Sequence, residues 1–269
     1  MKSMKKIAPL YALQAGWVRY KNRAGMYSAF TVLMFILSLV IAGFVTSVAS
    51  VFSTSAFLER TIVALLTGIF GAMISMGWAH FARKDEKGLL VEFGDFFSGF
   101  KVNVRSLVAV TVIITLATQL LSLVVPEEIA SFTLESNEGD AEELMMAFQD
   151  LQLVYSEHIN EIAIYFFSSL LLGLLFMFAQ YRASLEGDDP VRAIQWSMAH
   201  AVSNTINIIA LLVLIVVLTA VITVFTLGLG LLVVIPWVTL SLYDAYDQLL
   251  PDVESVEHEL DDELTTGDE

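Results

Sequence analysis

The sequence contains no cysteine, and charge is almost missing from its long hydrophobic runs. The lack of cysteine excludes disulfides, thiolate metal sites and a cysteine nucleophile. Six runs of about 20 residues have no Asp, Glu, Lys or Arg in their central portions. Ion-coupled transporters and intramembrane enzymes bury ionisable residues because their chemistry needs them. The sequence therefore argues against proton-coupled transport and intramembrane proteolysis, and we expect neither an enzyme nor a bound cofactor or metal.

Hydrophobic residues make up 57% of the 269 residues, and the mean hydropathy is +0.72. A helix rises ~1.5 Å per residue and the hydrocarbon layer is ~30 Å thick, so each run is long enough to span it. We therefore predict an all-α integral membrane protein with six transmembrane helices in one domain, residues 1–247. The predicted spans are approximately 27–52, 61–81, 105–125, 162–182, 205–226 and 229–247.

The first run differs from a secretory signal in its dimensions. It extends from about Met26 to Phe52 and follows a region of about 25 residues, whereas the apolar core of a signal peptide has roughly 7–15 residues. We expect a transmembrane helix that is retained.

Thirteen of the fourteen Lys and Arg residues fall on one side of the membrane in this topology. Only Arg60, between the first and second spans, falls on the other side. Cytoplasmic loops carry an excess of Lys and Arg. The basic side is therefore predicted to be cytoplasmic, with both termini there and the chain in the cell inner membrane.

Two acidic blocks contain no Lys or Arg: residues 126–161 with ten acids and residues 244–269 with eleven. The first is predicted to be an extracytoplasmic loop that contains an amphipathic helix near 139–161, lying along the membrane or the bundle. The tail at 248–269 is predicted to be disordered and solvated. Cation chelation and docking on a basic partner are the alternatives for the tail.

Apolar character runs almost unbroken from Ile206 to Leu242. One straight helix of this length would be roughly 55 Å long, nearly twice the membrane core. Gly228 and Gly230 are the only glycines in the run, so we predict that the chain reverses there. Pro236 should kink the last span or mark its first turn, because proline lacks an amide donor.

An amphipathic stretch of aromatic and basic residues precedes spans one, three and five. Such stretches are expected to lie in the membrane interface. This pattern predicts three units, each an interfacial helix followed by a helical hairpin. The alternative is that aromatic and basic flanks are common to any polytopic protein. The candidate functional residues on this face are Trp17, Arg19, Lys21, Phe100, Lys101, Asp189, Pro190, Arg192, Trp196 and His200.

The third stretch has a clear helix start. Asp189 can cap the helix and Pro190 suits its first position. Ala193, Trp196 and His200 then fall on one face.

Small residues recur four apart in span two, with Gly68 and Ala72 on one row and Gly71, Ser75 and Ala79 on the other. We expect this face to pack closely against another helix, inside the bundle or between copies. Elsewhere, Glu157, His158 and Glu161 fall within one helical turn, and a solvated face is favoured over a weak cation site.

The block "YRASLEGDDPVRAIQWSMAHAVSN" and the later "TLGLGLLVVIPWVTLSLYDAYDQL" resemble the YciC-like group of uncharacterised bacterial membrane proteins. The block is also similar to the membrane domain joined to some glycerophosphodiester phosphodiesterases. The resemblance covers about 70 C-terminal residues and implies a six-helix membrane fold without an assigned reaction. The matching positions are Asp188, Asp189, Pro190, Ala193, Ser197, Gly228, Gly230, Pro236, Ser241, Tyr243 and Tyr246.

These features favour a scaffold or accessory protein that acts through its cytoplasmic interfacial helices. Its expected partners are membrane lipids and a protein or a second copy of the chain, and not nucleic acid. A channel or carrier for a small neutral solute or lipid is the alternative. An enzyme with its site at the interface, around Asp188, Asp189, Arg192 and His200, is a third reading.

Overall fold

The computed structural model describes residues 5–52, 55–126 and 152–251, together with residues 145 and 149. Among these residues every regular element is a helix, and none is a strand. Five of the helices in these described ranges are long and apolar enough to cross a membrane. The prediction of an all-helical chain with long apolar helices is confirmed.

Each of the six predicted spans overlaps one long helix of the structure, and the fourth also overlaps the short helix α8 (Ala179–Tyr181). The last of them, α10, has 17 residues and is too short to be among the five that could cross a membrane. The six helices are α2 (Ala24–Phe52), α3 (Ala56–Glu86), α4 (Val104–Ser122), α7 (Ile159–Phe176), α9 (Pro190–Phe225) and α10 (Leu231–Asp247).

The chain reverses between α9 and α10 where the glycines predict it. Leu227 and Gly228 have φ values of 51° and 89°, in the left-handed region that glycine adopts without strain. The amide of Gly230 donates to the hydroxyl of Thr226 over 2.7 Å. Pro236 lies in the interior of α10 rather than in its first turn.

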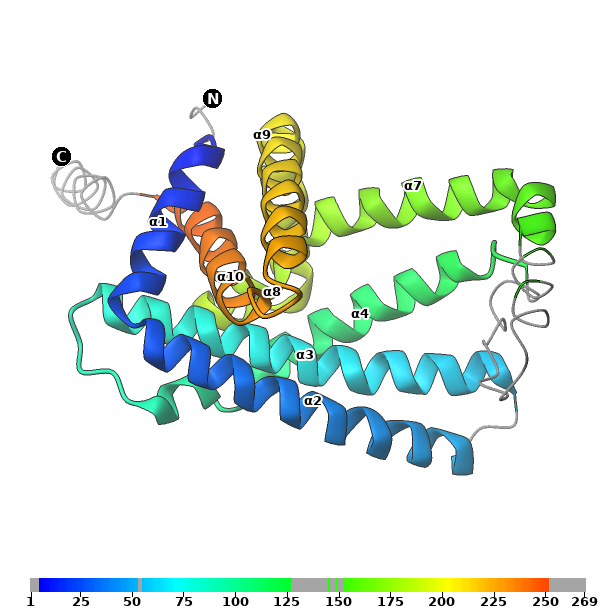
Figure 1. The fold of residues 1–269 in the computed structure, drawn as a ribbon, viewed down its shortest axis with the longest axis horizontal. Coiled ribbons are helices and arrows are strands. Elements are labelled where there is room, and N and C mark those ends of the chain that lie inside the picture. The colour runs from blue at the N-terminus through cyan, green and yellow to red at the C-terminus, as the bar shows by residue number, and fades with distance from the viewer. Residues whose placement is uncertain (1–4, 53–54, 127–144, 146–148, 150–151, 252–269) are drawn as a thin grey trace, which may run out of the picture.

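The helices do not form one parallel bundle. Figure 1 shows α2, α3, α4 and α7 extending to the same side of the molecule, while α9 and α10 run across them. A first helix, α1 (Pro9–Asn22), lies against α10, and a short 3-10 helix, η1 (Phe93–Phe100), lies against α3.

The three predicted units therefore differ from one another. The first stretch is the separate helix α1, and the second is the 3-10 helix η1. The third is continuous with its span, because α9 is one helix of 36 residues. The expectation of three equivalent hairpins, each preceded by its own interfacial helix, is not confirmed.

A cluster of aromatic side chains fills the place where α2, α3 and η1 meet. The ring of Phe96 in η1 stacks between Phe30 and Phe81, with centroids 4.3 Å and 4.0 Å away. Two glycines let η1 approach α3 this closely. A Cβ at Gly77 would lie 1.9 Å from the Phe96 carbonyl oxygen, and a Cβ at Gly99 would lie 2.0 Å from that of Met73.

The predicted small-residue face is present only in part. A Cβ at Gly68 would lie 3.1 Å from Thr115 Oγ1, so Gly68 faces α4 closely. A Cβ at Gly71 would meet nothing within 4 Å, so the expected packing inside the bundle does not involve Gly71. The structure describes the predicted helix at 139–161 only at residues 145, 149 and 152–161. The tail from residue 252 lies outside the described residues.

Candidate functional site: a charged cleft

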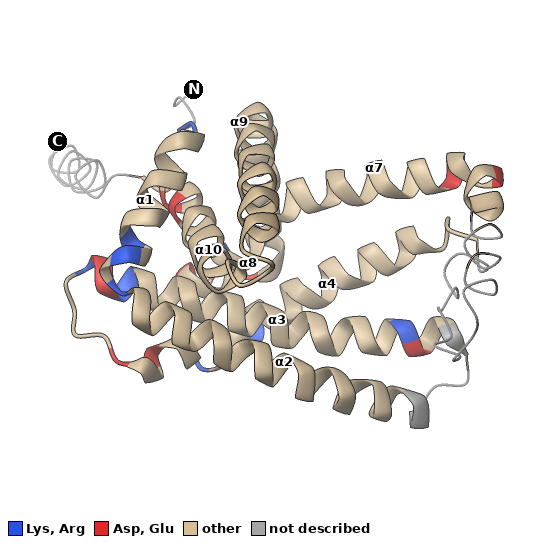
Figure 2. Cartoon of the chain, in the orientation of Figure 1, with Lys and Arg blue, Asp and Glu red and all other residues tan. Residues whose placement is uncertain are grey.

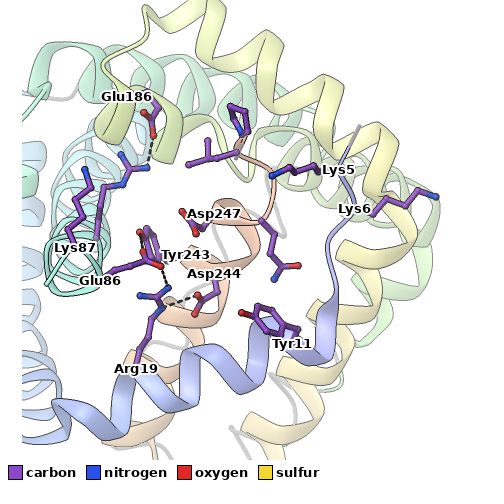
Figure 3. A pocket seen from close by; sticks show the side chains of 14 residues that line it. Lys5, Lys6, Tyr11, Arg19, Glu86, Lys87, Glu186, Tyr243, Asp244 and Asp247 are labelled. Atoms are coloured by element: carbon purple, nitrogen blue, oxygen red, sulfur yellow. Dashed lines mark hydrogen bonds and ion pairs between the residues drawn. The ribbon is translucent and has the colours of Figure 1, made fainter. Parts of the chain in front are cut away.

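Figure 2 shows that Lys, Arg, Asp and Glu gather at the end of the molecule where α1 lies and where α3 and α10 end. A cleft of about 780 Å³ opens at this end (Figure 3). We call it the charged cleft. Its lining residues are Lys5, Lys6, Tyr11, Arg19, Arg83, Glu86, Lys87, Glu186, Tyr243, Asp244, Asp247, Gln248, Leu250 and Pro251.

Arg19 of α1 joins two other helices at the cleft. Its Nε lies 2.9 Å from Asp244 Oδ1 on α10, and its terminal nitrogen lies 2.6 Å from Glu86 Oε1 on α3. The hydroxyl of Tyr243 donates to the second oxygen of Glu86 over 3.0 Å. Burial alone would lower the pKa of Arg19, but Asp244 and Glu86 outweigh it and raise the pKa. Arg19 is therefore a charged junction between the first helix and the last.

A second junction connects α3 to the segment that precedes α9. This segment contains α8 (Ala179–Tyr181) and a π-helical turn, η2 (Arg182–Glu186). Arg83 lies 2.5 Å from Glu186 Oε1 and donates to the carbonyl of Leu185 over 3.1 Å. The hydroxyl of Tyr246 donates to the same Glu186 oxygen over 3.0 Å. Two arginines and their carboxylates thus form the walls of the cleft.

Side-chain amides hold the chain that leads into α1. The Ile7 amide donates to Asn204 Oδ1 over 2.9 Å, and the Ala8 amide donates to Gln248 Oε1 over 2.7 Å. Asn204 also donates to the carbonyl of Lys5 over 3.1 Å. Pro9 occupies the first turn of α1 and has no amide hydrogen to donate. The amides just before this proline are those of Ile7 and Ala8, and the bonds to Asn204 and Gln248 satisfy them.

Close packing holds α1 along α10. The indole nitrogen of Trp237 donates to the carbonyl of Leu13 over 2.9 Å. A Cβ at Gly16 would lie 2.4 Å from the Ser241 hydroxyl oxygen and 2.6 Å from its backbone nitrogen. Glycine at position 16 is therefore required for this approach.

Two buried polar atoms of the cleft have no hydrogen-bond partner in the described structure: Asp244 Oδ2 and Gln248 Nε2. Asp244 is only 4% exposed. A buried polar group without a partner costs free energy. An external donor and an external acceptor would satisfy these two atoms.

The predicted functional residues do not form one site. Only Arg19 reaches the charged cleft. Trp17 packs on Tyr20 and on Trp237 with ring centroids 5.5 Å and 5.6 Å away, and Lys21 Nζ lies 5.9 Å from the Trp17 ring. This part of the predicted face supports the contact between α1 and α10.

Other members of the predicted face line a separate recess of about 710 Å³, formed by the start of α4 and the start of α9. Lys101, Asp189 and Pro190 belong to it. Asp189 accepts from the Arg192 amide over 3.1 Å, and Pro190 follows it, so the predicted cap is confirmed. The side chain of Arg192 is 74% exposed. The ring of Phe100, outside this recess, lies 6.4 Å from that of Phe97.

Trp196 and His200 stack with ring centroids 3.9 Å apart. His200 Nδ1 lies 2.9 Å from the carbonyl oxygen of Trp196, and the Arg182 guanidinium lies 5.0 Å from the Trp196 ring. Arg182 also pairs with Asp188 over 2.7 Å. The residues named for an enzyme at the interface, Asp188, Asp189, Arg192 and His200, are thus each engaged in local structural contacts.

The histidines of the described residues, His80, His158 and His200, contact different residues. His80 Nε2 lies 2.9 Å from the hydroxyl of Ser184, and His158 lies 4.0 Å from Glu161. Within the part of the chain that the structure describes, no three His, Cys, Asp or Glu side chains come close enough to hold a metal ion.

A smaller ion pair fixes η1. Lys84 Nζ lies 2.8 Å from both carboxylate oxygens of Asp95, which also accepts from the Glu92 amide over 2.7 Å. Burial would raise the pKa of Asp95. The Glu92 amide, Lys84 and the charge of Lys101 outweigh it and hold the pKa below its usual value.

Sequence reasoning missed the acids and the amide of the cleft: Glu86, Glu186, Asp244, Asp247 and Gln248. Asp244 falls in the acidic block of the tail by sequence, yet it lies on α10 and is buried. One feature of the sequence could have pointed to two of these residues. Asp244 and Gln248 are four residues apart, so their side chains share one face of a helix.

No family model, no curated protein and no solved structure matches the chain. The resemblance to the YciC-like group therefore stays a prediction. The described part of the chain is helical and contains five helices long and apolar enough to cross a membrane, and the charged cleft is the candidate site.

Proposed function

We propose that the chain is an integral protein of the cell inner membrane and acts as a scaffold or accessory protein without a catalytic role. The charged end faces the cytoplasm and contacts membrane lipids, a protein partner or a second copy. One observation carries this proposal: the charged side chains at this end bind one another and join helices. Membership of the YciC-like group is proposed with it, on the order of Asp189, Pro190, Gly228 and Pro236.

The pairing of these side chains supports a structural role. A general base must reach the proton that it abstracts. Asp188 and Glu186 instead accept from Arg182 and Arg83, and His200 contacts the backbone of its own helix. These three groups, which are suited to acid–base chemistry, are thus engaged in the fold.

The two sides of α1 support contact with the membrane surface or a partner. Ala12 and Leu13 are buried against the molecule. On the outer side, Leu10 and Val18 are 72% and 46% exposed. A helix that exposes apolar residues and carries basic ones is typical of a membrane interface or a binding surface.

The orientation can be tested because the natural chain has no cysteine. We expect a membrane-impermeant maleimide to label Leu123→Cys in cells with a permeabilised outer membrane and to leave Leu90→Cys unlabelled. Both positions are exposed, and they lie at opposite ends of the α3–α4 pair. Labelling of Leu90→Cys alone would contradict the cytoplasmic placement.

The scaffold role can be tested by photo-crosslinking in living cells. A photoreactive amino acid at Leu10, on the outer side of α1, should give discrete adducts with lipid, partner or a second copy. The matched control is Leu123, which is 61% exposed. The same adducts from both positions would show that the charged end has no specific partner.

A carrier for a small amphipathic solute or lipid is the second candidate. An apolar cavity of about 620 Å³ lies between α9 and α10, and Thr219, Thr223 and Thr239 are among its lining residues. Thr223 Oγ1 is buried without a partner in the described structure. Faster exchange of a fluorescent lipid between the leaflets of reconstituted vesicles, compared with empty vesicles, would favour this candidate over the scaffold.

A further inference from the structure

Two unsatisfied atoms of the charged cleft lie one helical turn apart. Asp244 Oδ2 needs a donor and Gln248 Nε2 needs an acceptor, and both are buried. Each residue's other polar atom is already used, by Arg19 in one case and by the Ala8 amide in the other. A molecule that satisfies both atoms must therefore present a donor and an acceptor side by side.

The unpaired charges around the cleft indicate which charges the donor and the acceptor of the ligand should carry. Arg19 and Arg83 are in ion pairs with carboxylates. No ion pair of Lys6, Lys87 or Asp247 occurs among the described residues that line the cleft. The available charges thus comprise two ammonium groups at the rim and a carboxylate one turn from Asp244. Figure 3 shows Asp244 and Asp247 on α10 at the cleft, with Lys87 on one side of it and Lys6, whose side chain points outward, on the other.

We propose that the charged cleft binds an amino-phosphate, a ligand in which a primary ammonium is joined to a phosphate. The ammonium donates to Asp244 Oδ2 and is further attracted by Asp247. The phosphate accepts from Gln248 Nε2, and the ammonium groups of Lys6 and Lys87, on opposite sides of the cleft, attract it at longer range. The cleft, at about 780 Å³, lies in the size range of small-molecule sites. An ethanolamine-phosphate lipid headgroup and a free amino-phosphate share this chemistry.

Two other occupants fit less well. The acidic tail from residue 252 has no Lys or Arg, so it cannot bring an ammonium or guanidinium group to Asp244. A water molecule could bridge Asp244 and Gln248, but it would leave the charges of Lys6, Lys87 and Asp247 without a partner. This site goes beyond the scaffold role, since a carrier could contain it equally.

The test uses the full chain in nanodiscs of phosphatidylglycerol, which has no amine. Calorimetric titration measures the binding of soluble phosphoethanolamine and of short-chain phosphatidylethanolamine. The matched controls are phosphocholine and short-chain phosphatidylcholine, whose quaternary ammonium has no N–H donor. We expect the ethanolamine compounds to bind at least about tenfold more tightly than the choline compounds, because loss of a bond to a charged group has this size. Binding of both ethanolamine compounds indicates recognition of the headgroup alone, and binding of the lipid alone indicates a lipid site.

The variants separate the two ends of the ligand. Gln248→Glu keeps an oxygen for the Ala8 amide and replaces the free donor with a negative charge, so it should weaken binding by about tenfold or more. Asp247→Asn should weaken binding by a smaller factor. The control is Asp85→Asn, which removes the same charge from a pair with Arg23 outside the cleft lining and should leave binding unchanged.

Three results would overturn the proposal. Equal binding of choline and ethanolamine compounds would contradict the proposed hydrogen bond from the ligand ammonium to Asp244. Equal binding of inorganic phosphate would leave a simple anion site. No binding by a folded protein would leave a bridging water as the occupant, and a matching melting temperature of Gln248→Glu and the natural chain verifies folding.

Discussion

The charged end and the opposite end of the molecule are held together by different means. At the charged end, α1, α3 and α10 are joined by ion pairs, by indole and amide hydrogen bonds, and by glycines in direct backbone contact. Toward the other end, helix α7 has no buried residue, and it extends away from the charged end (Figure 1).

This difference shows where each part of the chain finds its contacts. In a membrane, lipid tails are as apolar as leucine, so helices associate through close packing and polar bonds rather than hydrophobicity. Both are concentrated at the charged end. The apolar flanks of α7 instead expose large side chains such as Phe167 and Leu171, at 66% and 56%. Contacts at the charged end therefore fix how the helices are arranged. The parts of the helices that extend away from this end have few such contacts, and surrounding lipid would cover their exposed apolar side chains.

The largest effect should come from substituting Gly77, at the contact of α3 with η1. Gly77→Ala places a Cβ 1.9 Å from the Phe96 carbonyl oxygen, so η1 must move away from α3. We expect a loss of about 3 kcal/mol in the free energy of unfolding, measured in mild detergent. The control, Gly71→Ala on the same helix, meets nothing within 4 Å and should be neutral or stabilising by up to about 1 kcal/mol. Equal effects would show that η1 does not rest on Gly77.

Arg19 should follow. Arg19→Met leaves the buried carboxylate of Asp244 without its cation, so we expect a loss of about 3 kcal/mol in unfolding free energy. The comparison is Arg23→Met, whose pair with Asp85 is more exposed and should cost below about 1 kcal/mol.

The double variant sharpens this result. Arg19→Met with Asp244→Asn removes both charges, and it should recover part of the loss because no buried charge is left unpaired. Additive losses in the double variant would contradict the direct pairing of the two residues.

Asn204 should have a smaller and more local effect. Asn204→Ala removes the acceptor of the Ile7 amide and the donor to the Lys5 carbonyl. We expect a loss of about 1–2 kcal/mol and faster hydrogen exchange of residues 7–13. Asn207→Ala, three residues along α9, is the control, and its exchange pattern should match that of the natural chain.

The smallest effect is a dependence on pH. The pKa of Asp95 is lowered in the folded chain, so its stabilisation is complete above the unfolded value of about 4 and is lost as the pH falls through the folded value. Because Lys84 is 37% exposed, we expect less than about 1 kcal/mol. Thermal unfolding between pH 6 and pH 3 measures it. The slope should be reduced in Asp95→Asn and kept in Lys21→Gln.

Local features of the fold could be predicted from the sequence. The spans follow from runs of apolar residues, the reversal follows from Gly228, and the start of α9 follows from Asp189 and Pro190. Each of these signals lies within a few residues of the structure that it determines, so no knowledge of distant contacts is needed.

The site depended on distant contacts and could not be predicted in the same way. Arg19 and Asp244 are 225 positions apart, and the sequence around either residue does not indicate which residue it will contact. Spacing alone also treated Gly68 and Gly71 alike, although only Gly68 faces another helix, and it passed over Gly77 and Gly99. Whether a glycine is required depends on the backbone that crosses it.

The contact of α1 with α10 has a consequence for synthesis. The Leu13 carbonyl and the Trp237 indole that join them are 224 residues apart. At about 5–20 residues per second, the ribosome needs roughly 10–45 s to make the chain between them. During that interval α1 has been translated but its docking helix has not. We therefore expect a chain truncated before α10 to retain its first spans and to leave α1 open to proteases.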